Sequence, residues 1–356
     1  MAVSRINEAG LNINQYGNRN VIINGAMQVA QRGTSSTGLG SGAGYFTCDR
    51  WSITGTASAG RLTMTQESDG PSGFANSMKL ACTTADTSVA AGEKLILRQI
   101  LEGQDLQQFA KGTSDAKEFT VSFYVKGNAS ATYVFELFDS DNTRQISKTF
   151  SVTTDWTRVI LTFPADTTGA FSDDNGISLY AQIWLHAGSD FTSGTLNSSA
   201  WAAQTVANRA SSSATSFFDS TARTFFITGV QLEVGDTATD FEHRSFGDEL
   251  IKCKRYFTQW TGTANQTVGI GVVITGTTSF VGVQFPIEMR TGPTITESST
   301  YIYEPAASTV QSLGTIYNDE SSAGVNVTHS SGLTTGRAAM WNLTATGSYI
   351  RADAEL

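Results

Sequence analysis

The chain has 356 residues, of which 40% are hydrophobic and 15% charged, and its 32 acidic against 23 basic side chains give a formal net charge of −9. This length allows two domains with sizeable cores, and the hydrophobic content excludes a disordered polymer. An acidic chain without a basic run is not expected to bind nucleic acid, because phosphate contacts dominate such binding. No apolar stretch approaches the roughly 18 residues of a membrane span, so no membrane insertion is expected.

The cysteines and histidines do not indicate a metal or redox centre. The cysteines are odd in number, widely spaced and without a C-x-x-C pair: Cys48, Cys82 and Cys253. Such residues more readily pack as small hydrophobic side chains than form a disulfide framework. The histidines are equally dispersed and lack the H-E-x-x-H spacing of zinc enzymes: His186, His243 and His329. Neither a zinc site nor a histidine-based catalytic centre is expected.

The N-terminal region combines a polar arm with a strand-like stretch. Residues 1–16 are polar and irregular, without the apolar core of a signal peptide, which predicts an arm that docks onto another protein. Three β-branched residues then open NVIINGAMQVAQ, which predicts a strand over Asn20–Gln31 that breaks at Asn24-Gly25. The glycines of Gly38–Gly44 predict a flexible loop rather than a phosphate cradle, because neither a lysine nor an amphipathic helix follows.

Five later segments carry the period-2 pattern of strands with one buried side. They are Phe119–Val125, Tyr133–Phe138, Trp156–Phe163, Ile177–Leu185 and Phe225–Val234. In the last of them Val230, Leu232 and Val234 are predicted to point inward, with Gln231 and Glu233 outward. Segments rich in Gly, Ser, Asp and Asn separate the strands and supply turn chemistry. The pattern predicts an antiparallel β-sandwich.

Two stretches interrupt the strand pattern. The first, Glu102–Ala110, is predicted to form a turn or two of helix. The second begins at Ser245, which forms a capping-box-like pair with Asp248. A helical apolar face that includes Leu250 and Cys253 follows this pair. Strand-like pieces return beyond this second helix. The predicted fold class is therefore all-β. It comprises an arm over residues 1–16, a β-sandwich over 17–244, a connecting helix over 245–257 and a second, smaller β domain over 258–356.

Aromatic side chains on outward strand positions are the candidate binding residues. Tyr180, Gln182 and Trp184 alternate with the apolar face of Ile177–Leu185, and Tyr124 occupies an outward position on Phe119–Val125. Aromatic rings stack on the apolar faces of sugars while an amide fixes hydroxyl groups, so these four residues are candidate glycan contacts. The alternative is that a loop or a neighbouring subunit covers this face and makes the aromatic residues part of a core.

The acidic residues do not predict a hydrolase. Asp173 and Asp174, with Asp166 upstream, are candidates for the two carboxylates of glycoside hydrolysis, which lie about 5 to 10 Å apart. Adjacent aspartates point in different directions, however, and Asp-Asp-Asn-Gly is turn chemistry. The sequence also lacks a G-x-S-x-G elbow and a Cys/His arrangement. We expect no enzymatic activity.

Six separated segments, kept in order, together resemble a known family. They are NVIINGAMQVAQRGTS with YFTCDRW, LRQILEGQDLQQF, FTVSFYVKG, DTTGAFSDDNGISL, the tryptophan of SSAWAA, and FFITGVQLEVGDTATDFEHRSFGDELIKCKRYF. The resemblance is to minor virion and fibre proteins of tailed bacteriophages, and it spans residues 16–258. It implies a jelly-roll core similar to carbohydrate-binding modules of the galactose-binding-like fold. Within that core, Asn20–Gln31 would be the first strand and Gly229–Val234 the closing strand that pairs near it.

The resemblance also implies a function and partners. The expected protein is a tail, head or neck fibre of the virion, assembled in the host cytoplasm, that recognises a polysaccharide of the host surface. Its partners would be other virion proteins, bound through the arm, and further copies of itself in a homotrimer. The alternatives are an architectural virion component without sugar binding and, less favoured, a polysaccharide depolymerase.

The resemblance also implies a candidate metal site, because related sugar-binding sandwiches often hold a structural calcium ion beside the first and closing strands. Here the nearest oxygen donors would be Asn24, Gln28 and Glu233. Calcium prefers several oxygen ligands, and this set lacks the dense acidic cluster of a strong calcium loop. A structural calcium is the one cofactor that the sequence suggests.

Overall fold

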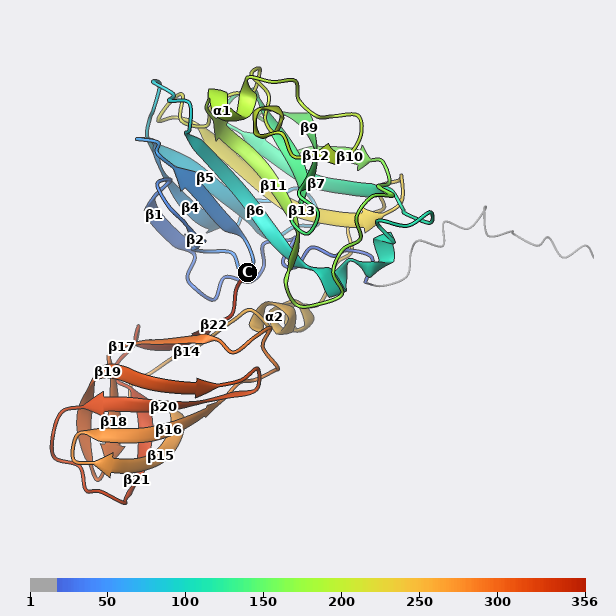
Figure 1. Ribbon diagram of the computed structural model, residues 1–356. Coiled ribbons are helices and arrows are strands. Elements are labelled where there is room, and N and C mark those ends of the chain that lie inside the picture. Colours follow the sequence, from blue (N-terminus) through green and yellow to red (C-terminus); the bar gives the residue numbers. More distant parts are fainter. Residues whose placement is uncertain (1–17) are drawn as a thin grey trace, which may run out of the picture. The chain divides into compact units, whose positions relative to one another are not determined.

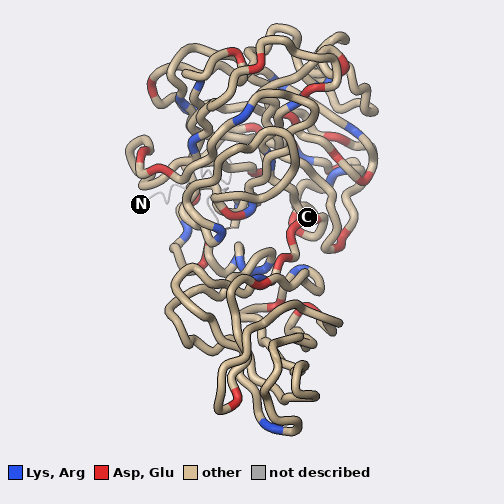
Figure 2. The backbone as a smooth tube through the Cα atoms, turned by 90° about the vertical axis from the view of Figure 1, so that its left-hand side faces the viewer, with Lys and Arg blue, Asp and Glu red and all other residues tan. Residues whose placement is uncertain are grey.

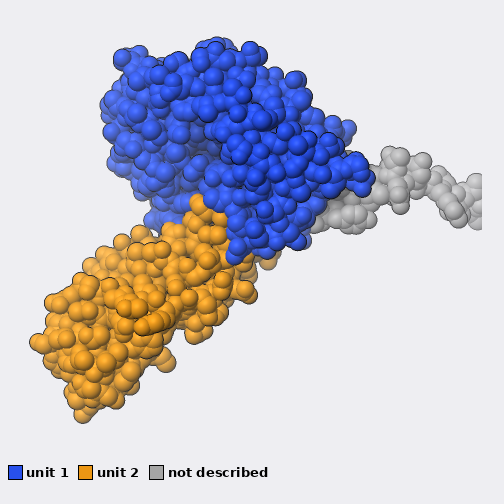
Figure 3. Space-filling view, viewed as in Figure 1, with its two compact units in different colours: residues 1–246 blue, residues 247–356 orange. Residues whose placement is uncertain are grey.

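The computed structural model describes residues 18–356, so the predicted arm over residues 1–16 lies outside the described residues. The chain divides into two compact units, residues 1–246 and 247–356 (Figure 3). This division falls within the range 245–257 predicted for the connecting helix. Charged positions are scattered thinly along the backbone of both units (Figure 2). No helix among the described residues is both long and apolar enough to cross a membrane.

The first unit consists of two antiparallel sheets that form a sandwich (Figure 1). The six-stranded sheet has the order β1 (Ser35–Leu39), β4 (Arg61–Glu67), β5 (Ser77–Thr84), β13 (Thr224–Val234), β7 (Phe119–Gly127) and β10 (Thr157–Phe163). The seven-stranded sheet has the order β12 (Ala202–Ala203), β9 (Arg144–Val152), β8 (Ala131–Asp139), β11 (Ile177–Ala187), β6 (Lys94–Glu102), β3 (Ser52–Thr56) and β2 (Ala43–Tyr45). The predicted all-β sandwich is confirmed.

The core lies between the two sheets, where the predicted apolar faces meet. Val121 and Phe123 of β7 are fully buried, as are Leu179 and Ile183 of β11. The Phe123 and Phe135 rings stack across the core with centroids 5.7 Å apart. Fully burying one such side chain contributes about 1.5 to 3 kcal/mol, so the period-2 pattern accounts for much of the sandwich's stability.

The opening stretch differs from its prediction as a strand. Asn24 and Met27 have φ angles of 56° and 54°, in the left-handed region that interrupts an extended chain. The stretch is therefore a set of turns beside β13. It is joined to β13 by bonds from Val21 N to Leu232 O, 3.1 Å, and from Val230 N to Gly25 O, 3.0 Å. A Cβ on Gly25 would lie 2.1 Å from the Val230 carbonyl oxygen, so this close approach requires glycine. The predicted closing strand does pair near the opening stretch.

The outward residues of β13 are also more buried than the alternation suggests. Gln231 and Glu233 point away from the core, yet both are fully covered. The chain beyond β13 folds back over them, and Gln231 Nε2 donates to Thr239 Oγ1 at 3.0 Å. The polar side chains on this face of β13 therefore form hydrogen bonds with the returning segment rather than with solvent.

Short helices connect the strands. The stretch predicted as a turn or two of helix contains two 3₁₀ turns, η1 (Gly103–Asp105) and η2 (Gln107–Phe109). A long connection from β11 to β13 contains α1 (Ser189–Thr192), β12 and η3 (Val206–Asn208). The predicted connecting helix is α2 (Phe246–Lys254), and it ends before Phe257, which begins the next strand.

The second unit is the predicted smaller β domain. Its three-stranded sheet has the order β14 (Phe257–Thr261), β22 (Tyr349–Asp353) and β17 (Thr294–Ser298). Its other strands close into a barrel in the order β15 (Thr267–Thr275), β16 (Thr278–Gln284), β20 (Ser322–His329), β19 (Ala306–Asn318), β18 (Thr300–Glu304) and β21 (Ala338–Leu343). Val281, Val325 and Trp341 fill its interior. The unit thus has a core of its own.

Candidate functional site

Three of the four predicted glycan contacts lie on the central strand of the seven-stranded sheet. Tyr180, Gln182 and Trp184 occupy successive outward positions of β11, between β6 and β8. Tyr180 is half-buried, whereas Gln182 and Trp184 are only 2% and 1% exposed. The structure therefore brings the three residues onto one face but leaves only Tyr180 accessible.

The connection after β11, residues 188–217, covers the other two residues. Trp184 packs against Ala210, and its ring centroid lies 5.1 Å from that of Phe191. This arrangement matches the alternative in which a loop covers the face, because Trp184 belongs to a small apolar cluster under that loop. A stacking role for Trp184 requires this cover to open.

A buried carboxylate organises the covered region. Glu136, opposite Gln182 on β8, accepts hydrogen bonds from Gln182 Nε2 and Trp184 Nε1, each at 2.6 Å. Arg209 of the covering connection adds bonds to both carboxylate oxygens, at 2.9 and 3.1 Å. Charge-assisted bonds of this kind are short and strong, so Glu136 attaches the connection to the sheet. We call Glu136, Gln182, Trp184 and Arg209 the Glu136 network.

Beside the Glu136 network the same face stays accessible. Tyr180 lies opposite Phe138 of β8, with ring centroids 5.7 Å apart, and both side chains are half-buried. The Arg98 guanidinium of β6 lies 5.0 Å from the Tyr180 ring centroid, and that of Arg209 lies 4.7 Å from the Phe138 centroid. We call Tyr180, Phe138 and Arg98 the Tyr180 platform. Half-open rings with adjacent guanidinium donors suit a sugar ring and its hydroxyl groups.

Phe138, Arg98 and Arg209 were not predicted as site residues. Arg98 occupies an outward position within the apolar run LILRQIL, and the alternation of Lys94, Ile96 and Arg98 is the only local signal for it. Their proximity to Tyr180 depends on the strand order β8-β11-β6, which the sequence pattern does not specify.

Tyr124 is separate from the other predicted contacts. It lies on β7, in the six-stranded sheet, where its ring packs against Phe74 with centroids 5.3 Å apart. A Cβ on Gly229 would lie 2.9 Å from the Tyr124 ring, so this contact is close. The four predicted residues therefore do not form one site.

The residues suggested for calcium already have protein partners. Asn24 Oδ1 accepts a hydrogen bond from Val29 N at 2.9 Å. Both carboxylate oxygens of Glu233 accept bonds from Thr239, at 2.9 Å from its N–H and 2.7 Å from its hydroxyl. Gln28 is half-buried, and its main-chain carbonyl accepts from Gln66. Among residues 18–356 no group of three His, Cys, Asp or Glu side chains is arranged to hold a metal. The calcium site stays a prediction.

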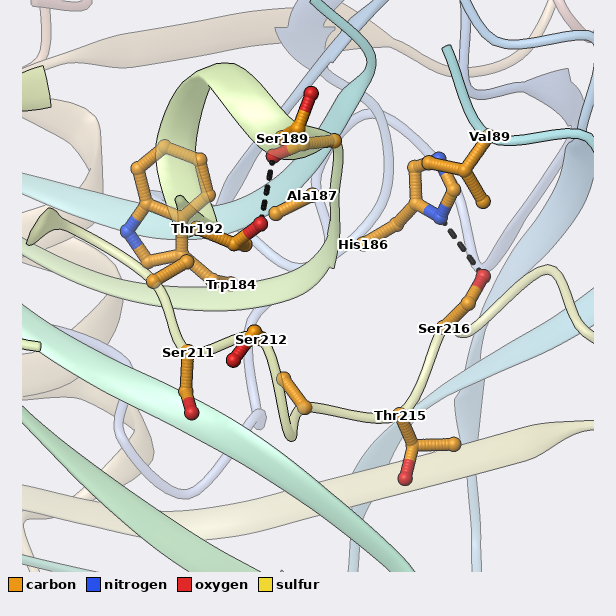
Figure 4. Close-up of a pocket in the computed structure, with 13 residues that line it drawn as sticks. Val89, Trp184, His186, Ala187, Ser189, Thr192, Ser211, Ser212, Thr215 and Ser216 are labelled. Carbon is orange, nitrogen blue, oxygen red and sulfur yellow. Dashed lines mark hydrogen bonds between the residues drawn. The ribbon is translucent and has the colours of Figure 1, made fainter. Parts of the chain in front are cut away.

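A cavity of about 280 Å³ lies beside the covered strand, lined by Trp184, His186 and several hydroxyl groups of residues 188–216 (Figure 4). His186 Nδ1 and Ser216 Oγ share a hydrogen bond of 2.8 Å, and His186 Nε2 lies 3.2 Å from Glu93 Oε2. Ser216, His186 and Glu93 thus follow one another in the order of a nucleophile, a base and an acid that orients the base. The Ser216 oxygen, however, also accepts the Phe218 N–H at 3.1 Å, as in a structural turn.

The aspartates considered for hydrolysis have different environments. Asp166 is buried and forms an ion pair with Arg144 at 2.7 Å, whereas Asp173 and Asp174 are exposed. Asp174 accepts the N–H of Gly176 at 2.8 Å, as expected for a turn. None of these contacts sets two carboxylates on either side of a sugar.

Comparison with known proteins gives distant structural similarities only. No protein-family model matches the chain, and no curated protein matches it. A CBM4 carbohydrate-binding module is 13% identical, with a TM-score of 0.32, and the match covers 59% of this chain and 97% of the module. The enzymatically active domain of tailspike protein 4 of bacteriophage CBA120 is 13% identical, with a TM-score of 0.31, over 61% of this chain and 21% of the tailspike chain.

A third structure is a family 11 carbohydrate-binding module from Clostridium thermocellum in complex with a β-1,3-1,4-mixed-linked tetrasaccharide. It is 10% identical, with a TM-score of 0.28, over 59% of this chain and 98% of the module. Similarities this distant do not assign a function to this chain.

Proposed function

We propose that this protein is a fibre-type virion component of a tailed bacteriophage and that its first unit binds a host-surface glycan. The observation that carries the binding proposal is the Tyr180 platform, where two half-open aromatic rings and a guanidinium lie together on the outer face of a rigid sheet. Sugar sites combine apolar surface with a few fixed polar groups, and strands hold both more precisely than loops. The virion assignment is supported by the six ordered segments of sequence resemblance.

Replacing Tyr180 by alanine is expected to weaken binding to the recognised polysaccharide about tenfold, as loss of an aromatic anchor does. The measurement is retention of the purified protein on immobilised bacterial polysaccharides. Tyr124→Ala is the matched control, because Tyr124 is also half-buried but lies on the other sheet. Equal losses for both variants, or no retention of the wild type on any polysaccharide, would contradict the proposal and favour the architectural role.

Attachment to the particle is the second part of this proposal. Residues 1–16 would dock onto another virion protein, at the head, neck or tail. A density map of the intact particle tests this placement, and a particle without this chain would refute it.

The chain would bind its glycan without cleaving it. In the described region, Asp173 and Asp174 occupy an exposed turn, and Ser216 is engaged by Phe218 N as well as by His186. Release of reducing ends from a bound polysaccharide, or hydrolysis of p-nitrophenyl acetate that Ser216→Ala abolishes, would show an enzyme instead.

Self-association, with a homotrimer as the proposed form, is supported by an exposed apolar stripe on the barrel. Ile270, Val272 and Ile274 of β15 are 70%, 41% and 45% exposed, and Met340 pairs beside Ile270. Contiguous exposed apolar surface of this kind is typical of protein interfaces. We therefore place a contact between copies of the chain on this stripe.

Replacing Ile270 by lysine is expected to shift the protein from oligomer to monomer, because a charge would enter an apolar contact. Light scattering coupled to size exclusion measures the mass. Gln311→Lys on β19, an exposed polar position three strands away around the barrel, should leave the mass unchanged. A monomeric wild-type protein would refute the contact.

A further inference from the structure

Three cations lie on the outer face of the seven-stranded sheet: Arg98 of the Tyr180 platform, and Lys94 and Arg209 next to it. Lys94 and Arg98 come from β6, and Arg209 comes from the covering connection. Arg209 is paired with Glu136 at 2.9 Å. Lys94 and Arg98 form no ion pair with any carboxylate in residues 18–356; their close partners are the rings of Phe191 and Tyr180. The face therefore carries positive charge that the described protein does not neutralise.

Arg98 also has an unused hydrogen-bond donor. Its Nε is buried and donates to no acceptor in the described part of the chain, while the side chain as a whole remains half-buried. A buried donor without an acceptor destabilises a protein, and native structures contain few of them. The guanidinium lies 5.0 Å from the Tyr180 ring centroid, so a sugar on that ring would lie within reach of its donors.

The electrostatic setting of these cations is unfavourable without an anion. Burial lowers the pKa of the Lys94 ammonium, and the nearby charges of Arg209 and Arg98 lower it further. Burial likewise lowers the pKa of Arg98, although Tyr180 and Tyr45 act in the opposite direction. In a chain with a net charge of −9, a local surplus of positive charge does not follow from composition. An incoming anion would relieve the repulsion between these groups.

Building on the proposed glycan binding, we infer that the ligand is an acidic glycan. Arg98 binds its anionic substituent while Tyr180 and Phe138 contact the sugar ring. Guanidinium groups offer a planar fork of donors that matches carboxylate and phosphate oxygens, which an ammonium does not. The shared chemistry is an oxyanion attached to a sugar, as in uronic acids and in phosphate-bearing polysaccharides. A neutral glycan could accept hydrogen bonds from Arg98, but it would leave the positive charges of Arg98 and Lys94 uncompensated.

The test is surface plasmon resonance of the full chain on immobilised bacterial polysaccharides of three kinds: uronate-bearing, phosphate-bearing and neutral. Binding is expected to acidic members, and removal of their anionic groups should weaken it at least about tenfold. The chemical treatment distinguishes the two anions, since carboxyl reduction neutralises uronates and hydrofluoric acid removes phosphates. Raising the salt concentration should weaken binding as well, because the contact is partly exposed to solvent.

Variants of Arg98 connect the effect to this site. Arg98→Gln should weaken binding to the acidic polysaccharide about tenfold or more. Arg98→Lys should weaken it less, because lysine keeps the positive charge but lacks the planar fork of donors. Lys79→Gln is the control, because it removes a cation that lies 5.4 Å from the Phe226 ring centroid on the other sheet. It should leave the affinity for the acidic polysaccharide unchanged. Thermal denaturation checks that every variant is folded.

The outcomes separate this inference from the proposed function. Binding that Tyr180→Ala abolishes, but that neither Arg98→Gln nor removal of the anionic groups weakens, would overturn the acidic ligand and leave glycan binding intact. Failure to bind any of the polysaccharides would overturn both.

Discussion

Replacing Lys111 by methionine is expected to lower the free energy of unfolding by about 3 to 5 kcal/mol, the usual effect of leaving a buried charge without its partner. The Lys111 ammonium lies 2.5 Å from Asp139 Oδ2 and 3.1 Å from Asp166 Oδ2. The side chains of Lys111 and Asp139 are both fully buried. Methionine fits the volume of the lysine stem but leaves the Asp139 carboxylate inside the protein without the lysine charge. Denaturant titration of the two proteins measures the difference.

Two further variants show whether the buried charge is the cause. Lys117→Met removes an exposed lysine from the same loop and should change stability by less than about 0.5 kcal/mol. Adding Asp139→Asn to Lys111→Met should recover part of the loss, because the uncompensated charge is then gone. An equal loss for Lys111→Met and Lys117→Met would mean that the ion pair contributes nothing specific.

The same cluster predicts a dependence on acid. Burial raises the pKa of the Asp166 carboxyl, but hydrogen bonds from Arg144 and Lys111 outweigh burial, so the pKa lies below its ordinary value. A carboxyl group with a lowered pKa in the folded state contributes stability above the unfolded-state pKa of about 3.9. This contribution is lost as the pH falls through the lower folded-state value. Below about pH 4, the free energy of unfolding of Lys111→Met should therefore fall less steeply with decreasing pH than that of the wild type.

Replacing Arg209 by methionine is expected to lower the free energy of unfolding by about 3 kcal/mol, near the low end for a broken buried ion pair. The fully buried Glu136 carboxylate would lose its cation but keep the hydrogen bonds from Gln182 and Trp184. Because Arg209 attaches the connection over residues 188–217 to the sheet, proteolysis of that connection should become faster. Denaturant titration and limited proteolysis measure the two effects.

A conservative variant provides the control for Arg209. Arg209→Lys keeps the charge but loses the paired bonds, at 2.9 and 3.1 Å, to the two oxygens of Glu136. Its free energy of unfolding should therefore lie between those of the wild type and Arg209→Met. If the connection resists protease equally in the wild type and in Arg209→Met, the Glu136 network does not hold the cover in place.

The strands and the division of the chain were predictable because their signals are local. Side chains alternate across a strand, so the apolar positions of Phe119–Val125 and Ile177–Leu185 indicated their buried faces directly. The capping pair and apolar face after Ser245 likewise indicated α2. The opening stretch is the exception: the turn at Asn24 agrees with the predicted break, but Met27 also has a positive φ, and the flanking residues form turns although their composition is that of a strand.

Composition and alternation by themselves determined an all-β protein of two units, with Tyr180 on an outward strand position. Only the tertiary structure decided which outward positions stay accessible. It placed Tyr124 on the opposite sheet, covered Trp184 with the connection held by Arg209, and brought Arg98 beside Tyr180. The physical reason is that alternation sets the direction of a side chain along its own strand. Strand order and long connections, formed by contacts between distant residues, decide what that side chain meets.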